Sequence, residues 1–133
     1  GWLQMMVPPH WMNEIIAEFG RSAGIDGFSF GSNATAALGF ESGASLVFEY
    51  AYSSLIVMMT VPVALDSSVA EKALKFVMPE RRGEFRIKAG FLSEKDKVFF
   101  AVRLPHDEVT LPVINSAFSY LRRLADQFGE GAR

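Results

Sequence analysis

The sequence contains no cysteine, so disulfide bonds and thiol chemistry are excluded. Its only histidines are His10 and His106, which leaves no histidine pair at the spacing of a zinc site. The longest apolar run, residues 55–61, is far shorter than the roughly 20 residues of a membrane-spanning helix, and the N-terminus lacks the pattern of a signal peptide. We therefore expect a soluble protein of a reducing cytoplasm, without a metal, a cofactor or a membrane partner.

The sequence also lacks a large excess of charge of either sign, since it has 13 basic and 15 acidic residues and a formal net charge of −2. This balance gives no general attraction to nucleic acid. The only doubled basic pairs are Arg81-Arg82 and Arg122-Arg123, and each lies close to acidic residues. A solvated face is therefore favoured over nucleic-acid contact for both pairs.

Signatures of catalysis are missing as well. The glycines never form a phosphate-binding GxGxxG or GxxxxGK[ST] motif, and no serine lies in a GxSxG elbow. The cluster His106-Asp107-Glu108 could in principle transfer protons, but consecutive side chains do not converge on one substrate atom. It is better explained as a solvated loop before a helix, so the protein is not expected to be an enzyme.

What the sequence does have is apolar residues, which make up 50% of its 133 residues, with 13% aromatic. A chain of this length forms one domain, here residues 1–133, with residues 1–5 predicted as a leading segment outside the fold. The apolar content exceeds what a core of this size hides. Part of the apolar surface is therefore expected to contact a partner.

Apolar periodicity predicts three helices. The first spans residues 11–23 and ends at Gly24, and the second follows a capping box at Ser68 and Glu71. The third is capped by Thr110, tolerates Pro112 in its first turn and continues to Phe128.

Alternating apolar residues predict short strands over residues 28–30, 36–40 and 46–50. Residues 55–61 are apolar on both faces, which indicates a strand buried on both sides or covered by a partner. Residues 85–92 and 98–104 are predicted as a hairpin. The predicted fold class is α+β, an antiparallel sheet flanked by three helices in the order α-β-β-β-(β)-α-β-β-α.

Short motifs at the two ends of the chain are the most specific features. They are KAGFL at 88–92, VFFAV at 98–102, TLP at 110–112, AF at 117–118 and, near the N-terminus, HWMNEII at 10–16. Together with the element order, they resemble the class I chaperones of bacterial type III secretion. Within that group the likeness is greatest to SycN-type chaperones of YopN-type gatekeeper proteins.

The resemblance implies a dimeric bacterial chaperone that binds an N-terminal segment of a secreted effector or gatekeeper protein. Without ATP, it would keep this client soluble and ready for secretion. For client contact we expect Trp11, Ile15, Phe28, Phe30, Leu38 and Phe40. For the dimer interface, with a second copy or a different chaperone subunit, we expect Leu74, Val77, Phe85, Ile87 and Phe91. Burial in the core is the competing interpretation for each of these residues.

Two further interpretations stay open. One is a small ligand-binding domain or enzyme with a polar pocket formed by Asp66, Arg103, His106 and Glu108, for which a deep pocket would be the evidence. The other is a structural subunit that binds a permanent partner.

Overall fold

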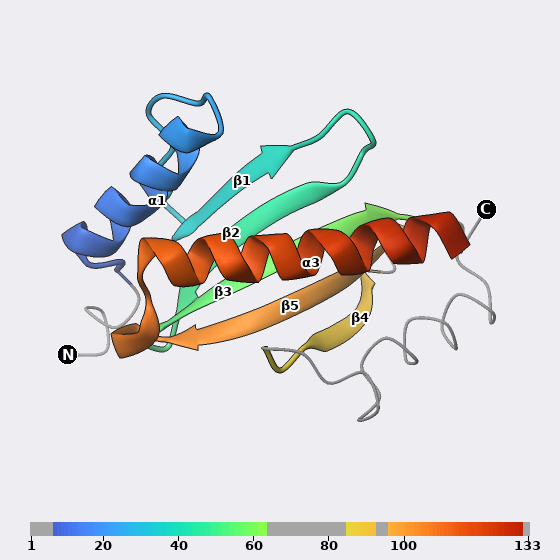
Figure 1. The fold of residues 1–133 in the computed structure, drawn as a ribbon. Helices are drawn as coiled ribbons and strands as arrows, with labels where there is room; N and C mark the ends of the chain where they lie inside the picture. The colour runs from blue at the N-terminus through green and yellow to red at the C-terminus, as the bar shows by residue number, and fades with distance from the viewer. Residues whose placement is uncertain (1–6, 64–84, 93–95, 132–133) are drawn as a thin grey trace.

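The computed structural model describes residues 7–63, 85–92 and 96–131, and places them in one five-stranded antiparallel sheet with helices against it (Figure 1). The elements are α1 (His10–Ser22), β1 (Thr35–Gly39), β2 (Ser45–Ala51), β3 (Ser54–Pro62), β4 (Lys88–Leu92), β5 (Lys97–Pro105), the 3-10 turn η3 (His106–Glu108) and α3 (Leu111–Gly131). The strand order is β1-β2-β3-β5-β4. The predicted α+β class with an antiparallel sheet is confirmed.

Two predicted segments lie outside the described residues. They are the leading segment, residues 1–5, and the second helix after Ser68. The other two predicted helices are present as α1 and α3. The Val113 N–H donates to Thr110 Oγ1 at 3.2 Å, which confirms the predicted cap of α3.

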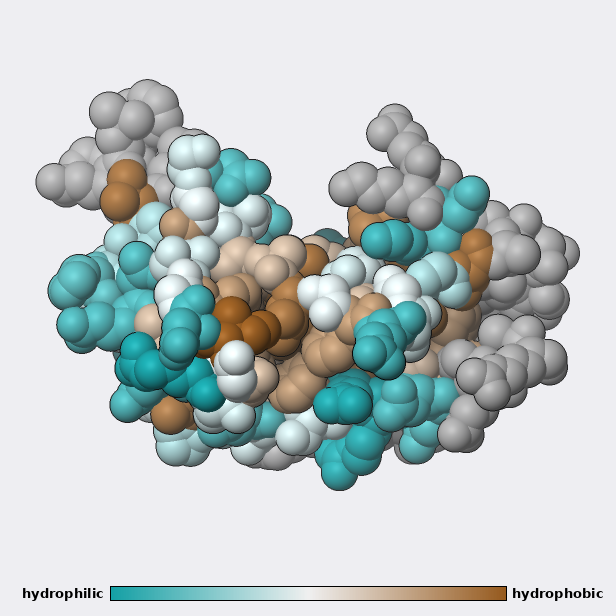
Figure 2. All heavy atoms as spheres, turned by 90° about the horizontal axis from the view of Figure 1, so that it is seen from above, coloured by the Kyte–Doolittle hydropathy of each residue, from teal (hydrophilic) through white to brown (hydrophobic). Residues whose placement is uncertain are grey.

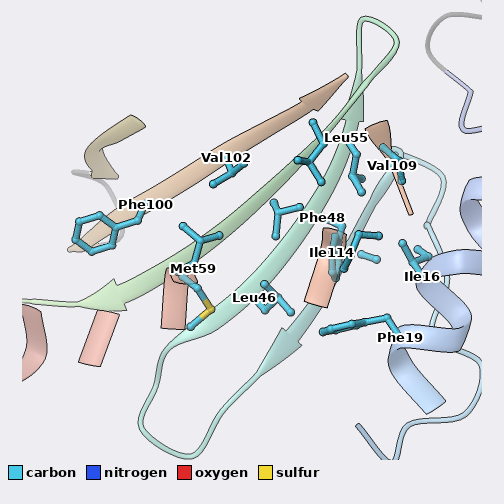
Figure 3. Close-up of a cluster of buried hydrophobic side chains, with 14 of the residues drawn as sticks. Ile16, Phe19, Leu46, Phe48, Leu55, Met59, Phe100, Val102, Val109 and Ile114 are labelled. Carbon is cyan, nitrogen blue, oxygen red and sulfur yellow. The ribbon is translucent and has the colours of Figure 1, made fainter. Parts of the chain in front are cut away.

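The alternation along the central strands explains the position of the core. Leu46, Phe48, Leu55 and Val57 are fully buried on one face of β2 and β3. In Figure 3 the side chains of Phe19 from α1 and Ile114 from α3 belong to the same cluster. Both described helices therefore cover the same face of the sheet.

The opposite face carries the residues that alternate with the core. Val47, Ile56, Met58 and Phe99 lie there at half-buried positions, and Arg103 is exposed. Residues 55–61 were predicted as a strand that is apolar on both faces and either buried on both sides or covered by a partner. The structure places Leu55 and Val57 in the core, but leaves Ile56 and Met58 without cover from a described helix.

The predicted strand at residues 28–30 is wrong, because these residues form a loop that follows α1. The Phe30 N–H donates to Asn13 Oδ1 at 3.1 Å instead of pairing with a neighbouring strand. Phe28 is buried, with its ring 5.9 Å from that of Phe48. The alternation that predicted a strand therefore reflects a loop that turns every second side chain towards the core. The hairpin is confirmed, but its first strand begins at Lys88 instead of residue 85.

Among the described residues, neither helix has the length and hydropathy that crossing a membrane would require.

Candidate functional site

Strand β1 lies at the end of the sheet, and its outer edge pairs with no described strand. Along an antiparallel pair, successive residues alternate between bonding to the neighbour and pointing away from it. The Tyr50 N–H donates to the Ala34 carbonyl at 2.9 Å, which fixes this alternation. The backbone N–H and carbonyl groups of the even-numbered residues of β1 therefore point towards β2. Those of Thr35, Ala37 and Gly39 point outward, away from the sheet.

The outward backbone of β1 is accessible over only a short length. The Thr35 carbonyl accepts the Gly31 N–H at 2.8 Å, so a local turn occupies the start of the strand. Ala37 and Gly39 are both exposed, and their outward N–H and carbonyl groups form what we call the free edge. Strand β1 reads TAALG and has none of the charged or proline residues that commonly block pairing at a sheet edge.

An aromatic cluster lies directly after the free edge. The rings of Phe40 and Phe118 are stacked at 6.2 Å, with an interplanar angle of 10°. The Arg122 guanidinium lies 5.6 Å from the Phe40 ring centroid and 5.9 Å from that of Phe118. We call these three residues the aromatic rim. Phe118 also contacts Phe19 of α1 edge to face at 5.5 Å, so the rim is anchored to the core.

Apolar surface gathers around these elements. Figure 2 shows the molecule from the side on which α1 and β1 lie in Figure 1, with apolar atoms in the middle and hydrophilic atoms beside and below them. The half-buried residues Ile15, Phe30, Leu38, Phe40 and Phe118 come from α1, the following loop, β1 and α3. An extended apolar chain that reached the free edge would therefore meet apolar side chains.

The residues predicted for client contact fall into three groups. Ile15, Phe30, Leu38 and Phe40 are half-buried and pack against the core. Trp11 is 37% exposed, and its ring lies 5.0 Å from that of His106, edge to face. Phe28 is a buried core residue and offers little surface to a partner.

The residues predicted for the dimer interface are only partly described, because Leu74 and Val77 lie outside the described residues. Phe91 on β4 is 38% exposed, and Ile87 is half-buried just before that strand. The Phe85 ring lies 6.1 Å from that of Tyr120 on α3. These residues are at the β4 end of the sheet, opposite to the free edge.

Sequence reasoning missed Phe118 and Arg122 as site residues. Phe118 was assigned to the core stripe of the last helix, and Arg122 to a solvated face. A signal was present, because residues four apart lie on the same side of a helix and an arginine there can cover an aromatic ring. Contact with Phe40 depends on the tertiary fold, however, and no local pattern shows it.

The polar residues of the alternative pocket that the structure describes lie on the surface instead of lining a deep pocket. Arg103, His106 and Glu108 are all exposed, and Asp66 lies outside the described residues. Over the same described ranges, no group of three or more histidine, aspartate or glutamate side chains could hold a metal ion.

Comparison with protein families gives one informative match. The model of the type III secretory system chaperone SycN family matches residues 11–128. The chain belongs to this family. The family match confirms the predicted type III secretion chaperone. Comparison with curated proteins finds no similar sequence.

Solved structures of low sequence identity share the fold of this chaperone. A chain of the ExsC-ExsE complex matches with a TM-score of 0.78 at 17% identity, covering 92% of this chain and 93% of that one. A chain of the HopA1-SchA chaperone-effector complex has a TM-score of 0.66 at 15% identity, covering 92% and 99%. A chain of the ExoU-SpcU complex from the type III secretion system of Pseudomonas aeruginosa has 0.62 at 15%, covering 87% and 93%.

Proposed function

We propose that this chaperone binds an N-terminal segment of a secreted effector or gatekeeper protein in extended form, along the free edge of β1. The observation that carries the proposal is the outward backbone of Ala37 and Gly39 beside the aromatic rim. Main-chain hydrogen bonds to a sheet edge give affinity, and adjacent apolar side chains give selectivity. This arrangement keeps a client segment from aggregating, because its own strand edge and apolar side chains are covered.

The work requires no chemical step. Holding an extended segment needs neither a catalytic group nor ATP, since pairing and apolar contact supply the free energy of binding. We infer that the protein acts as a chaperone in the bacterial cytoplasm and not as an enzyme. The name of one matched complex, chaperone-effector, is consistent with such a client.

Replacing Ala37 by proline tests the edge directly. The Ala37 N–H points away from β2, so proline removes an outward donor without breaking the β1–β2 ladder, and proline is tolerated in this way on edge strands. We expect client affinity to fall about tenfold, which corresponds to the loss of about 1.4 kcal/mol. The measurement is fluorescence anisotropy with overlapping peptides from the N-terminal region of the gatekeeper protein of the same secretion system.

The matched control is Ala37→Val, which keeps the N–H and favours a strand. It should bind the peptides as the wild type does. Circular dichroism should show that both variants fold. Equal binding by the proline variant and the wild type would contradict pairing at this edge.

The β4 end of the sheet is our proposed contact with a second chaperone subunit. Phe91 is a large exposed apolar side chain on that strand, and such side chains are enriched in permanent interfaces. Phe91→Asp should convert dimers into monomers in light scattering behind a size-exclusion column. Tyr52→Asp, which changes an exposed aromatic residue in the β2–β3 turn, should leave the dimer intact. A dimer that survives Phe91→Asp would place the interface elsewhere.

A further inference from the structure

Arg122 lies beside two aromatic rings at the point where the free edge ends. Its guanidinium lies over both Phe40 and Phe118, at 5.6 and 5.9 Å from their centroids. A guanidinium has five N–H donors in its own plane, and a cation–π contact with an aromatic ring leaves these donors available to bind an anion. The side chain is therefore oriented without its donors being used.

No acidic side chain neutralises Arg122 within the part of the chain that the structure describes. Asp126 lies one helical turn further along α3, and Glu41 follows Phe40 in sequence, but neither forms an ion pair with it. The ion pair described there joins His10 and Glu14 at 3.2 Å. Arg122 thus presents a positive charge at the border of an apolar surface.

The direction of β1 brings a bound segment to this charge. Leu38 and Phe40 lie on the face of β1 that α3 covers, because side chains alternate along the strand and Leu38 pairs with the buried Leu46. In a segment paired with Ala37 and Gly39, every second side chain would lie on the face of the sheet that α3 covers. These side chains would contact Leu38, then Phe40 and finally Arg122.

We infer that the client segment carries an acidic residue, aspartate or glutamate, which binds Arg122 at the end of an otherwise apolar stretch. This inference rests on the proposed function and adds the charge of the client to it. A carboxylate matches the planar donors of a guanidinium in a bidentate geometry that an amide does not reproduce. Arg122 would therefore select the register of the segment as well as its composition.

The adjacent residue Arg123 is a matched control. It is also exposed, and its guanidinium lies 5.7 Å from the ring centroid of Tyr120. Tyr120 contacts Phe85, which leads into β4, so Arg123 lies near the β4 end of the sheet, whereas Arg122 lies near Phe40. The two arginines are both exposed and both lie near an aromatic ring, but only Arg122 lies near Phe40, which directly follows β1.

The test is selection from a display library of random peptides, about twelve residues long, against the wild type and the variants Arg122→Gln and Arg123→Gln. The wild type should enrich extended apolar peptides, with aspartate or glutamate about fivefold over the library at one fixed position. This enrichment should be lost for Arg122→Gln, while the apolar pattern is kept, and Arg123→Gln should retain both.

The outcomes distinguish failure of the inference from failure of the proposed function. Apolar peptides without a fixed acidic residue would overturn the role of Arg122 and leave the client-binding edge in place. Loss of the acidic preference in both variants would show a general attraction to the two adjacent arginines and would also overturn it. Absence of an apolar pattern in the wild-type selection would contradict both proposals.

Discussion

Phe48→Ala is expected to lower the free energy of unfolding by about 3 to 5 kcal/mol, as is typical when a buried phenylalanine is truncated to alanine. Phe48 is fully buried in the middle of β2. Its ring meets Phe19 of α1 at 5.4 Å and Phe28 of the following loop at 5.9 Å, both edge to face. Truncation therefore leaves a cavity where the sheet, the helix and the loop come together. Urea denaturation followed by circular dichroism measures the loss.

The control for this substitution is the next residue along the strand. Val47 points to the opposite face of β2 and is half-buried, so Val47→Ala removes less buried volume and should lower the free energy of unfolding by about 1 kcal/mol. Similar losses for the two variants would contradict the assignment of the core to one face of the sheet.

Gly20→Ala is expected to destabilise the protein by about 2 kcal/mol, although alanine normally favours a helix over glycine by about 1 kcal/mol. A Cβ at this position of α1 would lie 2.5 Å from Phe28 Cβ and 3.2 Å from the Ile25 carbonyl oxygen. Both atoms belong to or lie next to the backbone, so the contact is not relieved by rotating the end of a side chain. The loop would have to move away from the helix.

Gly39→Ala is the comparison for the glycine prediction. No atom lies within 4 Å of the position that its Cβ would take, so the free energy of unfolding should stay within about 0.5 kcal/mol of the wild type. Thermal unfolding followed by calorimetry compares the two variants. A Gly20→Ala protein as stable as Gly39→Ala would show that the loop after α1 does not pack as closely as described.

The sequence was most informative where apolar residues recurred at one regular spacing over many positions. The apolar stripe of α3 predicts its burial, and Ile114, Leu121 and Phe128 are indeed fully buried. The strands β2 and β5 were predicted by the same reasoning. Residues 28–30 show where it fails, because a period of two over three residues is satisfied equally by a strand and by a loop packed on a helix. The structure identifies the loop, because the Phe30 N–H donates to Asn13 Oδ1 and residues 28–30 pair with no described strand.

The candidate site was less predictable than the fold. Ile15, Phe30, Leu38 and Phe40 were expected to contact the client because the resemblance implies an apolar client-binding surface. The structure places them as half-buried side chains of α1, its following loop and the β1 strand region. Their role in client contact stays a prediction. The stacking of Phe40 on Phe118 joins residues 78 positions apart, and a pattern within one element cannot show such a contact. The resemblance supplied the family, but not this geometry.

The shortness of the free edge has a kinetic consequence. Two residues of β1 offer outward backbone groups, and each hydrogen bond contributes about 0.5 to 1.5 kcal/mol. Under the proposed binding mode, a segment paired along this short edge would dissociate more quickly than one paired along a full strand, since differences in affinity are expressed mainly in the rate of release. Rebinding would keep the client covered on average, while each brief opening would expose its first residues to the secretion machine. Transfer would then be driven by competition for the client, with no energy source in the chaperone itself.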